Sequence, residues 1–209
     1  MTNDFMVPIT NDQGPEADKS IWSTAAVEKL MIALDEGYKV KGTPFYEGRP
    51  DLRRGNIVFE YTDEEMEHIR RCATDILYFA EHFATVMTDE GLQRIHLRDY
   101  QKDMLVNFVN NRFNVCLASR QIGKTICSAI FIAWYVLFNF DKNALILSNK
   151  GGTTKEIIDK VKAILENLPF FLKPGMLKYD VMNMKFDNGC RIVGQSTTGK
   201  AGIGFTIHL

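Results

Sequence analysis

The chain has 209 residues, of which 45% are hydrophobic and 24% are charged, and its formal net charge is −1. This is an ordinary soluble globular composition, sufficient for one substantial core with an appendage. The chain has no global basic field, so any contact with nucleic acid would have to come from local patches. The N-terminus lacks the form of a signal peptide, and the most apolar run, residues 129–140, is too short to span a bilayer. We therefore expect a cytosolic protein.

The cysteines and histidines show no pattern of a disulfide framework or a metal site. The four cysteines are widely scattered without C-x-x-C spacing, and they are expected to be reduced core residues: Cys72, Cys116, Cys127 and Cys190. The four histidines show no ligand spacing, so a zinc site is not expected.

The first half of the chain predicts a tail followed by helices. Residues 1–22 are polar and contain turn residues, which favours a flexible N-terminal tail. Residues 23–95 are expected to form a mostly helical region. A first helix is predicted from Ser23 to Gly37, residues 42–55 read as a loop, and a helical pattern with a break near Asp75 covers residues 62–87.

Residues 96–209 alternate between helix and strand signals. A helical pattern over 97–110 precedes an apolar, β-rich run at 113–119 that predicts a buried strand. The remaining predicted elements are a helix over 125–139, a strand over 143–149, a helix over 153–169 and a hairpin over 184–196 that turns at Asn188-Gly189. This order predicts an α/β fold with a mostly parallel sheet flanked by helices, of the P-loop NTPase type.

The stretch from Val115 to Ser128, VCLASRQIGKTICS, follows the phosphate-loop pattern G-x-x-x-x-G-K-[ST] except that Ala118 replaces the first glycine. Gly123 permits a tight approach to phosphate, Lys124 supplies positive charge, and Thr125 offers a hydroxyl to Mg²⁺. The alternative is a chance Gly-Lys-Thr at the start of a helix. A buried strand before the tripeptide and an apolar helix after it favour a nucleotide site.

Several segments resemble the large terminase subunit of tailed bacteriophages, the ATP-driven motor that packages DNA into proheads. The resemblance is carried by S-R-Q-x-G-K-T at Ser119 to Thr125, by DILYFAEHFATVM and LRDYQKDML upstream, and by ALILSNK and FDNGCRIVGQS downstream. It covers about residues 65–209 and is nearest to the myovirus type. The first ~60 residues carry no specific resemblance.

The resemblance implies that ATP and Mg²⁺ bind at the loop. Gln101 matches the glutamine that reads the adenine edge, and a solvated helix residue is its alternative reading. Arg120 matches an arginine that acts on the γ-phosphate, and a positioning ion pair is an equal alternative. Lys124 and Arg120 are the expected catalytic residues, and Thr125 is the expected Mg²⁺ ligand. The expected nucleotide-binding residues are Arg98, Gln101, Ser119, Arg120, Gln121, Ile122, Gly123, Lys124, Thr125 and Ile126.

ATP hydrolysis by this class of ATPase needs a further strand that ends in Asp-Glu. No such pair follows a strand signal here, and the last residues, GIGFTIHL, match the place where the family's next strand would start. The sheet is therefore expected to be incomplete, and the 209 residues are expected to hold ATP but to hydrolyse it poorly. The family's C-terminal nuclease domain is also not recognisable.

The resemblance further implies double-stranded DNA, the portal protein, the small terminase subunit or a complementary C-terminal fragment as partners, in the host cell cytoplasm. Two other functions stay open. One is a non-hydrolysing assembly module of the packaging complex, and the other is a helicase-like P-loop ATPase fragment, since helicases also pair an upstream glutamine with a phosphate loop.

Overall fold

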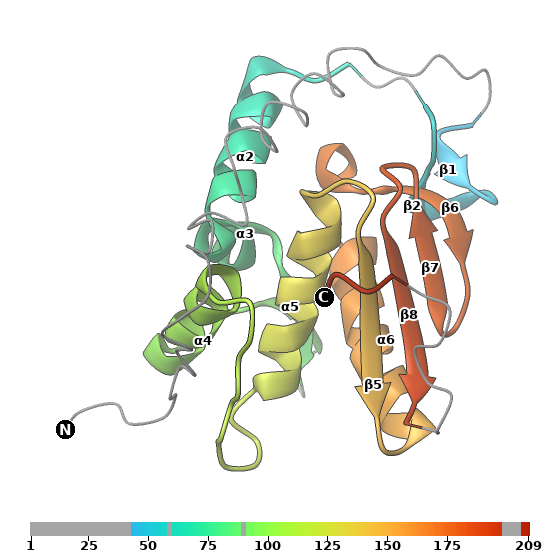
Figure 1. Ribbon diagram of the computed structural model, residues 1–209. Coiled ribbons are helices and arrows are strands. Elements are labelled where there is room, and N and C mark those ends of the chain that lie inside the picture. Colours follow the sequence, from blue (N-terminus) through green and yellow to red (C-terminus); the bar gives the residue numbers. More distant parts are fainter. Residues whose placement is uncertain (1–42, 58–59, 89–90, 198–205) are drawn as a thin grey trace.

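The computed structural model describes residues 43–57, 60–88, 91–197 and 206–209. These residues form an α/β fold in which helices lie against one face of a six-stranded sheet, and two further strands form a separate hairpin (Figure 1). The predicted tail 1–22 and the predicted helix from Ser23 to Gly37 lie outside the described residues.

The helices are α2 (Asp63–Thr74), α3 (Ile76–Phe83), α4 (Asp99–Asn110), α5 (Lys124–Leu137), α6 (Gly151–Glu166) and the short 3₁₀ helix η1 (Phe170–Leu172). The strands are β1 (Phe45–Tyr46), β2 (Arg49–Arg54), β3 (Thr85–Thr88), β4 (Gly91–Arg94), β5 (Asn143–Ser148), β6 (Gly175–Tyr179), β7 (Asn183–Phe186) and β8 (Arg191–Ser196).

Local capping explains where α2 and α3 begin and end. Thr62 and Glu65 form a capping box at the start of α2, with the Thr62 N–H donating to Glu65 Oε2 at 2.9 Å. Asp75 follows the last residue of α2, and its Oδ1 accepts the Leu77 N–H at 2.8 Å in the first turn of α3. Because Asp favours caps over helix interiors, it divides one apolar pattern into two helices. The predicted break near Asp75 is confirmed.

The predicted helix over 62–87 ends earlier than expected. Helix α3 stops at Phe83, and Thr85–Thr88 pairs with Gly91–Arg94 as an antiparallel hairpin, β3–β4. This hairpin was not predicted. The β-branched residues Thr85 and Val86 favour a strand, and the strand signal is masked in sequence by the helical spacing that precedes it.

The six-stranded sheet is mixed, with the strand order β1-β2-β6-β7-β8-β5. Strands β5 and β8 are parallel, as are β2 and β6, whereas β1–β2, β6–β7 and β7–β8 are antiparallel. The α/β class is as predicted, but the mostly parallel sheet is not what forms. Strands β6, β7 and β8 follow one another through short turns, and a short connection can join only antiparallel neighbours.

The predicted turn at Asn188-Gly189 is confirmed between β7 and β8. Gly189 has φ = 80°, and a Cβ at this position would lie 2.0 Å from Asp141 Oδ1, so only glycine fits. Asn188 Nδ2 donates to the carbonyls of Val136 and Asn139 at 2.7 and 2.8 Å. The turn therefore also satisfies carbonyl groups at the C-terminal end of α5.

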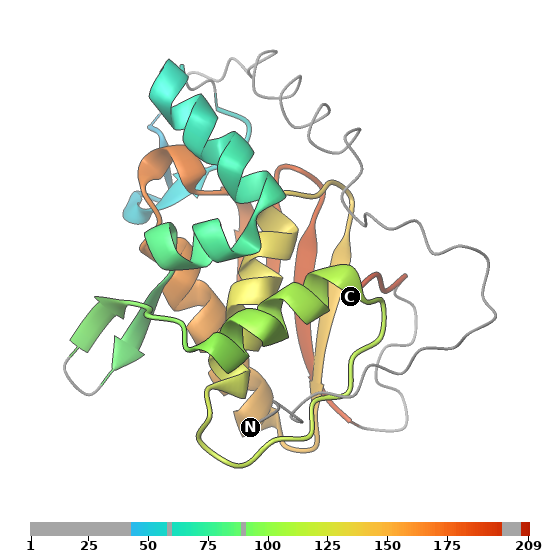
Figure 2. The same ribbon diagram turned by 90° about the vertical axis from the view of Figure 1, so that its left-hand side faces the viewer.

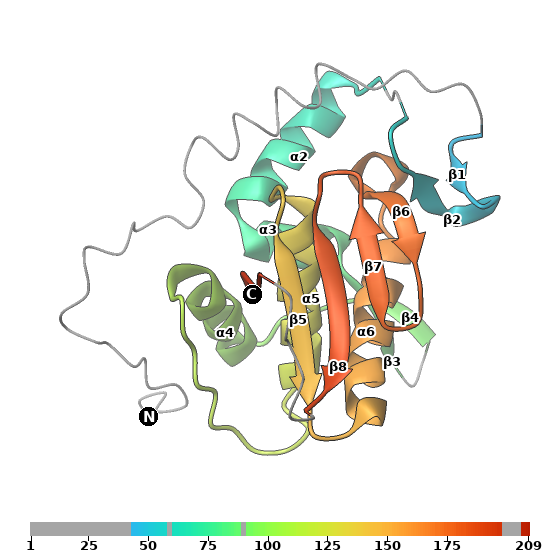
Figure 3. The same ribbon diagram turned by 45° about the vertical axis from the view of Figure 1, so that its right-hand side comes forward.

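The run 113–119, predicted as a buried strand, forms no strand. Its three large apolar side chains are exposed, with fractional exposures of 71% for Phe113, 58% for Val115 and 86% for Leu117. The first part of the free edge of β5 is instead taken by the residues 206–209, since the His208 N–H donates to Asn143 O at 3.0 Å and the Leu145 N–H to Leu209 O at 2.9 Å. Figure 3 shows the chain between α4 and α5 passing outside β5 without joining the sheet.

The segment 42–55, predicted as a loop, contributes β1 and β2 to the sheet. Long-range polar contacts hold it there. Lys173, itself buried, donates from Nζ to Asp51 O at 2.7 Å and to the carbonyl of Glu166. The Glu166 carboxylate accepts from Arg49 at 2.9 Å and from the Tyr179 hydroxyl at 2.5 Å. These partners come from distant parts of the chain, so the turn-rich composition of the segment did not reveal the strands.

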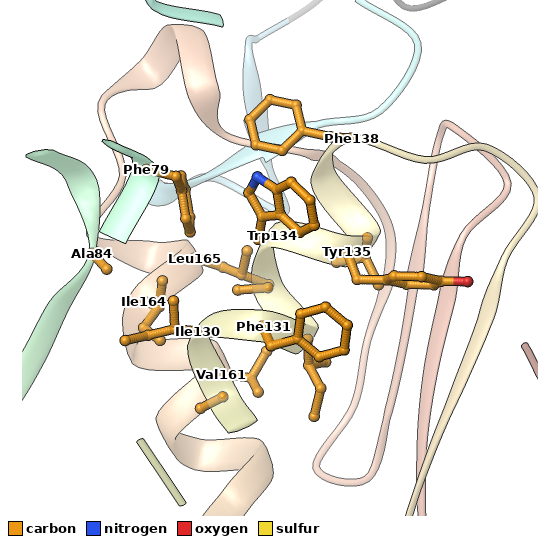
Figure 4. Close-up of a cluster of buried hydrophobic side chains, with 14 of the residues drawn as sticks. Phe79, Ala84, Ile130, Phe131, Trp134, Tyr135, Phe138, Val161, Ile164 and Leu165 are labelled. Atoms are coloured by element: carbon orange, nitrogen blue, oxygen red, sulfur yellow. The ribbon is translucent and has the colours of Figure 1, made fainter. Parts of the chain in front are cut away.

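The hydrophobic core is formed by the sheet and by two layers of helices on one of its faces. Helices α5 and α6 cover one face of the sheet, and α2, α3 and α4 lie in front of α5 in Figure 2. Helix α5 is therefore enclosed on both sides, which explains why nearly all of it is apolar. Figure 4 shows Trp134 of α5 among side chains of α3 and α6, including Phe79 and Leu165. Its indole Nε1 donates to Cys72 O in α2 at 2.6 Å.

The cysteines are free thiols, and three of them are buried in this core. Burial raises the pKa of the Cys72 thiol to about 12 and that of the Cys127 and Cys190 thiols to about 11. A thiol with a raised pKa is a poor nucleophile, so these three agree with the predicted role as reduced core residues. Cys116 is only partly buried. Within the described part of the chain, no helix has the length and apolar character required to cross a membrane.

Candidate phosphate-binding loop

The candidate loop, residues 119–123, leads directly into the N-terminus of α5. Strands β5 and β8 are parallel, and both end at the lower edge of the sheet in Figure 1, where α5 and α6 begin. Ligands of open α/β sheets bind outside the carboxyl ends of the strands, where helix N-termini also point their N–H groups. The loop therefore lies at the edge of the fold where an anion site is expected.

The backbone of the loop changes hand twice within three residues. Gln121 has φ = 64° and Gly123 has φ = 88°, whereas Ile122 between them is not in the left-handed region. Alternation of this kind turns successive N–H groups toward one concave side, as in backbone nests that bind anions. Gly123 also precedes the first residue of α5, whose first N–H groups have no partner within the helix.

The ammonium group of Lys124 lies against the start of the loop. Lys124 Nζ donates to Ala118 O at 3.1 Å and to Ser119 O at 2.5 Å. The side chain thus reaches from the first residue of α5 back to the start of the loop. A cation held in this place is available to an anion that enters the loop, because phosphate oxygens can replace the two carbonyl groups as its acceptors.

Gln101 of α4, which is distant from the loop in sequence, is in direct contact with it. It is only 8% exposed, and its Nε2 donates to Ile122 O at 3.2 Å while its Oε1 accepts the Arg98 N–H at 3.0 Å. A Cβ on Gly123 would lie 2.4 Å from Gln101 Nε2, so the glycine is required by packing as well as by its φ angle. One N–H of the amide and one lone pair of Oε1 are not used by these two hydrogen bonds.

The other predicted residues lie at three places. Ser119, Arg120 and Gln121 are exposed at the tip of the loop, and Thr125 and Ile126 are partly buried in the first turn of α5. The side chain of Arg98 is exposed at the start of α4. Among the described residues, no carboxylate lies within salt-bridge distance of Arg120. The alternative reading of Arg120 as a positioning ion pair thus has no described partner in this structure.

Two contacts at the same edge were missed by sequence reasoning. Ser148 Oγ, at the end of β5, lies 2.5 Å from Thr154 Oγ1 in α6, which in turn donates to Gln195 O of β8 at 3.2 Å. These hydrogen bonds fix the start of α6 against the two parallel strands. The Ile122 carbonyl was missed as well, since a backbone acceptor has no signature among side-chain types.

A cavity of about 460 Å³ lies beside the loop, between β3, α5 and α6. Its floor is mostly apolar, and two ion pairs of α6 lie along it, Lys155–Asp159 and Lys160–Glu156. Of the predicted site residues, only Ile126 lines this cavity. The cavity is therefore distinct from the candidate phosphate site at the loop.

The fold and the loop together define an α/β protein with a candidate anion-binding turn at the N-terminus of a buried helix. Residues 115–206 match the family described as terminase large subunit, T4likevirus-type, N-terminal. The match extends from the loop to the end of the hairpin β7–β8 and beyond, a little less than half of the chain, and it confirms the resemblance seen in the sequence. Residues 115–206 are thus similar to the N-terminal portion of a phage large terminase subunit.

Proposed function

We propose that this chain is the ATP-binding N-terminal part of the terminase motor that packages viral DNA. The observation that carries the proposal is the loop itself: the left-handed Gln121 and Gly123, the start of α5 and the ammonium group of Lys124 converge within six residues of backbone. Backbone N–H groups, a helix N-terminus and a lysine are the groups that bind the phosphates of nucleotides. They lie within the segment that matches the terminase family.

The residues present fit ATP and Mg²⁺ at this loop. Gly123 has φ = 88°, a conformation that glycine adopts without steric cost, as is needed where the backbone of a phosphate loop turns tightly. Lys124 would hold the terminal phosphates, Thr125 would offer its hydroxyl to Mg²⁺, and Arg120 at the exposed tip would reach the γ-phosphate. Bound Mg²⁺ would neutralise charge on the phosphate oxygens. Packaging-complex partners, double-stranded DNA among them, follow from the family and belong to this proposal.

A second candidate is an assembly module that does not hydrolyse ATP. The observation in its favour is the exposed apolar run of Phe113, Val115 and Leu117, which lies next to the loop. Clusters of exposed apolar side chains are often covered by a partner. Binding of nucleotide distinguishes the two candidates, because only the first requires it.

Nucleotide binding is expected to raise the melting temperature of the protein when Mg²⁺ is present. The rise should be larger with ATP or ADP than with GTP. A ligand at about 100 times its Kd stabilises the folded state by about 2.7 kcal/mol, which is a shift of several degrees for a chain of this size. Differential scanning fluorimetry with each nucleotide measures the shift.

The controls are inorganic phosphate, which lacks the polyphosphate chain, and Mg²⁺ alone. Shifts of equal size with ATP and GTP would contradict adenine recognition but not phosphate binding. If no nucleotide moves the melting temperature, the assembly module becomes the better description.

A further inference from the structure

The side chain of Gln101 joins two segments that are far apart in the sequence. Its Oε1 accepts the N–H of Arg98 at 3.0 Å, and its Nε2 donates to the carbonyl of Ile122 at 3.2 Å, 21 residues downstream. The first contact completes the start of α4, and the second reaches the middle of the candidate loop. Because the side chain is 8% exposed, these hydrogen bonds are partly shielded from competition by water.

The contact with Ile122 determines the direction of the next N–H group. A trans peptide is planar, so the C=O of Ile122 and the N–H of Gly123 point in opposite directions. The described residues contain no cis peptide, so this geometry holds here. Since the Ile122 carbonyl faces Gln101, the Gly123 N–H faces the other side of the loop, away from α4. That N–H is the last one before the start of α5.

Packing enforces the same arrangement. Nε2 of Gln101 occupies the place that a Cβ on Gly123 would need, at 2.4 Å. The amide therefore supports the left-handed Gly123 from outside the loop, and Gln121 turns the chain to the left-handed region on the other side of Ile122. With Gln101 in place, the peptide between Ile122 and Gly123 cannot flip without losing a partly buried hydrogen bond.

We infer that Gln101 is a positioning residue of the phosphate loop: it holds the Ile122 carbonyl so that the Gly123 N–H is directed at phosphate. This inference rests on the proposed ATP binding and goes beyond it, because it assigns to Gln101 a role that does not involve the base. Removal of the amide then weakens the binding of every polyphosphate to a similar degree, whatever base it carries.

The test uses two variants and a ligand without a base. Gln101→Met retains the length of the side chain and removes both hydrogen bonds, whereas Gln101→Glu retains an acceptor for the Arg98 N–H and removes the donor to Ile122. Asn110→Asp, at an exposed position at the other end of α4, is the control for a change from amide to acid on this helix. Isothermal titration measures the affinities for tripolyphosphate, ATP and GTP with Mg²⁺, and the melting temperature without ligand checks the fold.

We expect both Gln101 variants to lose about tenfold or more in affinity for tripolyphosphate and ATP alike, with the ratio of ATP to GTP affinity within about twofold of the wild type. Negative charge alone could weaken binding to Gln101→Glu, so the loss must also appear in Gln101→Met. In the free protein, the amide NMR resonance of Gly123 is expected to shift in both variants and to stay in place in Asn110→Asp.

Two results would overturn the inference while leaving the proposed function intact. One is unchanged tripolyphosphate affinity with loss of the preference for ATP over GTP, which would make Gln101 a reader of the base only. The other is wild-type affinity for all three ligands. If the wild-type chain itself binds neither tripolyphosphate nor ATP, the proposed function fails first, and the inference fails with it.

Discussion

Replacing Lys124 with Ala is expected to abolish the rise in melting temperature that ATP produces. Lys124 provides the ammonium group that lies across the loop, with Nζ 3.1 Å from Ala118 O and 2.5 Å from Ser119 O. Without it, the phosphates lose a charge-assisted partner, and the full shift of several degrees expected at saturating ATP disappears. Scanning fluorimetry of the wild type and the variant with ATP and Mg²⁺ measures the difference.

The matched control is Lys185→Ala, which removes an exposed lysine from β7. It should retain the wild-type shift, since it lies on a strand and not on the loop. Alanine is a good helix former, so Lys124→Ala should itself fold, with a loss of about 1 kcal/mol from the two missing hydrogen bonds. A wild-type shift in Lys124→Ala would mean that ATP binds elsewhere.

Trp134→Ala is expected to have the largest effect on stability. Trp134 of α5 is 1% exposed and packs among side chains of α3 and α6. It donates its indole N–H to the Cys72 carbonyl at 2.6 Å. Removal of a buried Trp side chain leaves a cavity and costs about 3–5 kcal/mol. Urea unfolding followed by far-UV circular dichroism measures this loss, because the signal does not depend on the tryptophan.

Trp134→Phe is the milder variant at this position. It retains an aromatic ring but removes the N–H donor together with part of the indole volume, so the unpaired Cys72 carbonyl and the smaller ring should together cost at least about 1–3 kcal/mol. Phe113→Ala is the control for loss of an aromatic ring at an exposed position, and it should stay within about 0.5 kcal/mol of the wild type. If Trp134→Phe is as stable as this control, the hydrogen bond to Cys72 contributes nothing measurable.

Structural features that depend only on residues close in sequence could be predicted. The break at Asp75 and the turn at Gly189 follow from side-chain capping and from positive φ, which act over a few residues. Strand pairing depends on which edge is open, and this is a property of the whole fold. The run 113–119 has the composition of a buried strand but pairs with no strand. The turn-rich segment β2, in contrast, pairs with β6, and Lys173 donates a hydrogen bond to its backbone.

The candidate site shows the same division. The Gly-Lys-Thr loop and the upstream glutamine were found because their side chains have a known spacing before a helix. Their mutual geometry could not be predicted, because it is made of backbone carbonyls: Ile122 O for Gln101, and Ala118 O and Ser119 O for Lys124. Any residue type can supply such a carbonyl, so the sequence contains no mark of it.

The mixed sheet also has a kinetic consequence. The meander of β6, β7 and β8 joins neighbours in sequence, so it closes only short loops and should form early in folding. The parallel pairs β5–β8 and β2–β6 close much longer loops, since Asn143 pairs with Arg191 and Arg53 pairs with Gly175. Loop closure must precede the contacts that reward it, so β5 and then β2 should join the sheet late. In pulsed hydrogen exchange during refolding, amides of β7 are therefore expected to gain protection before those of β5, and β2 should be the last of the three.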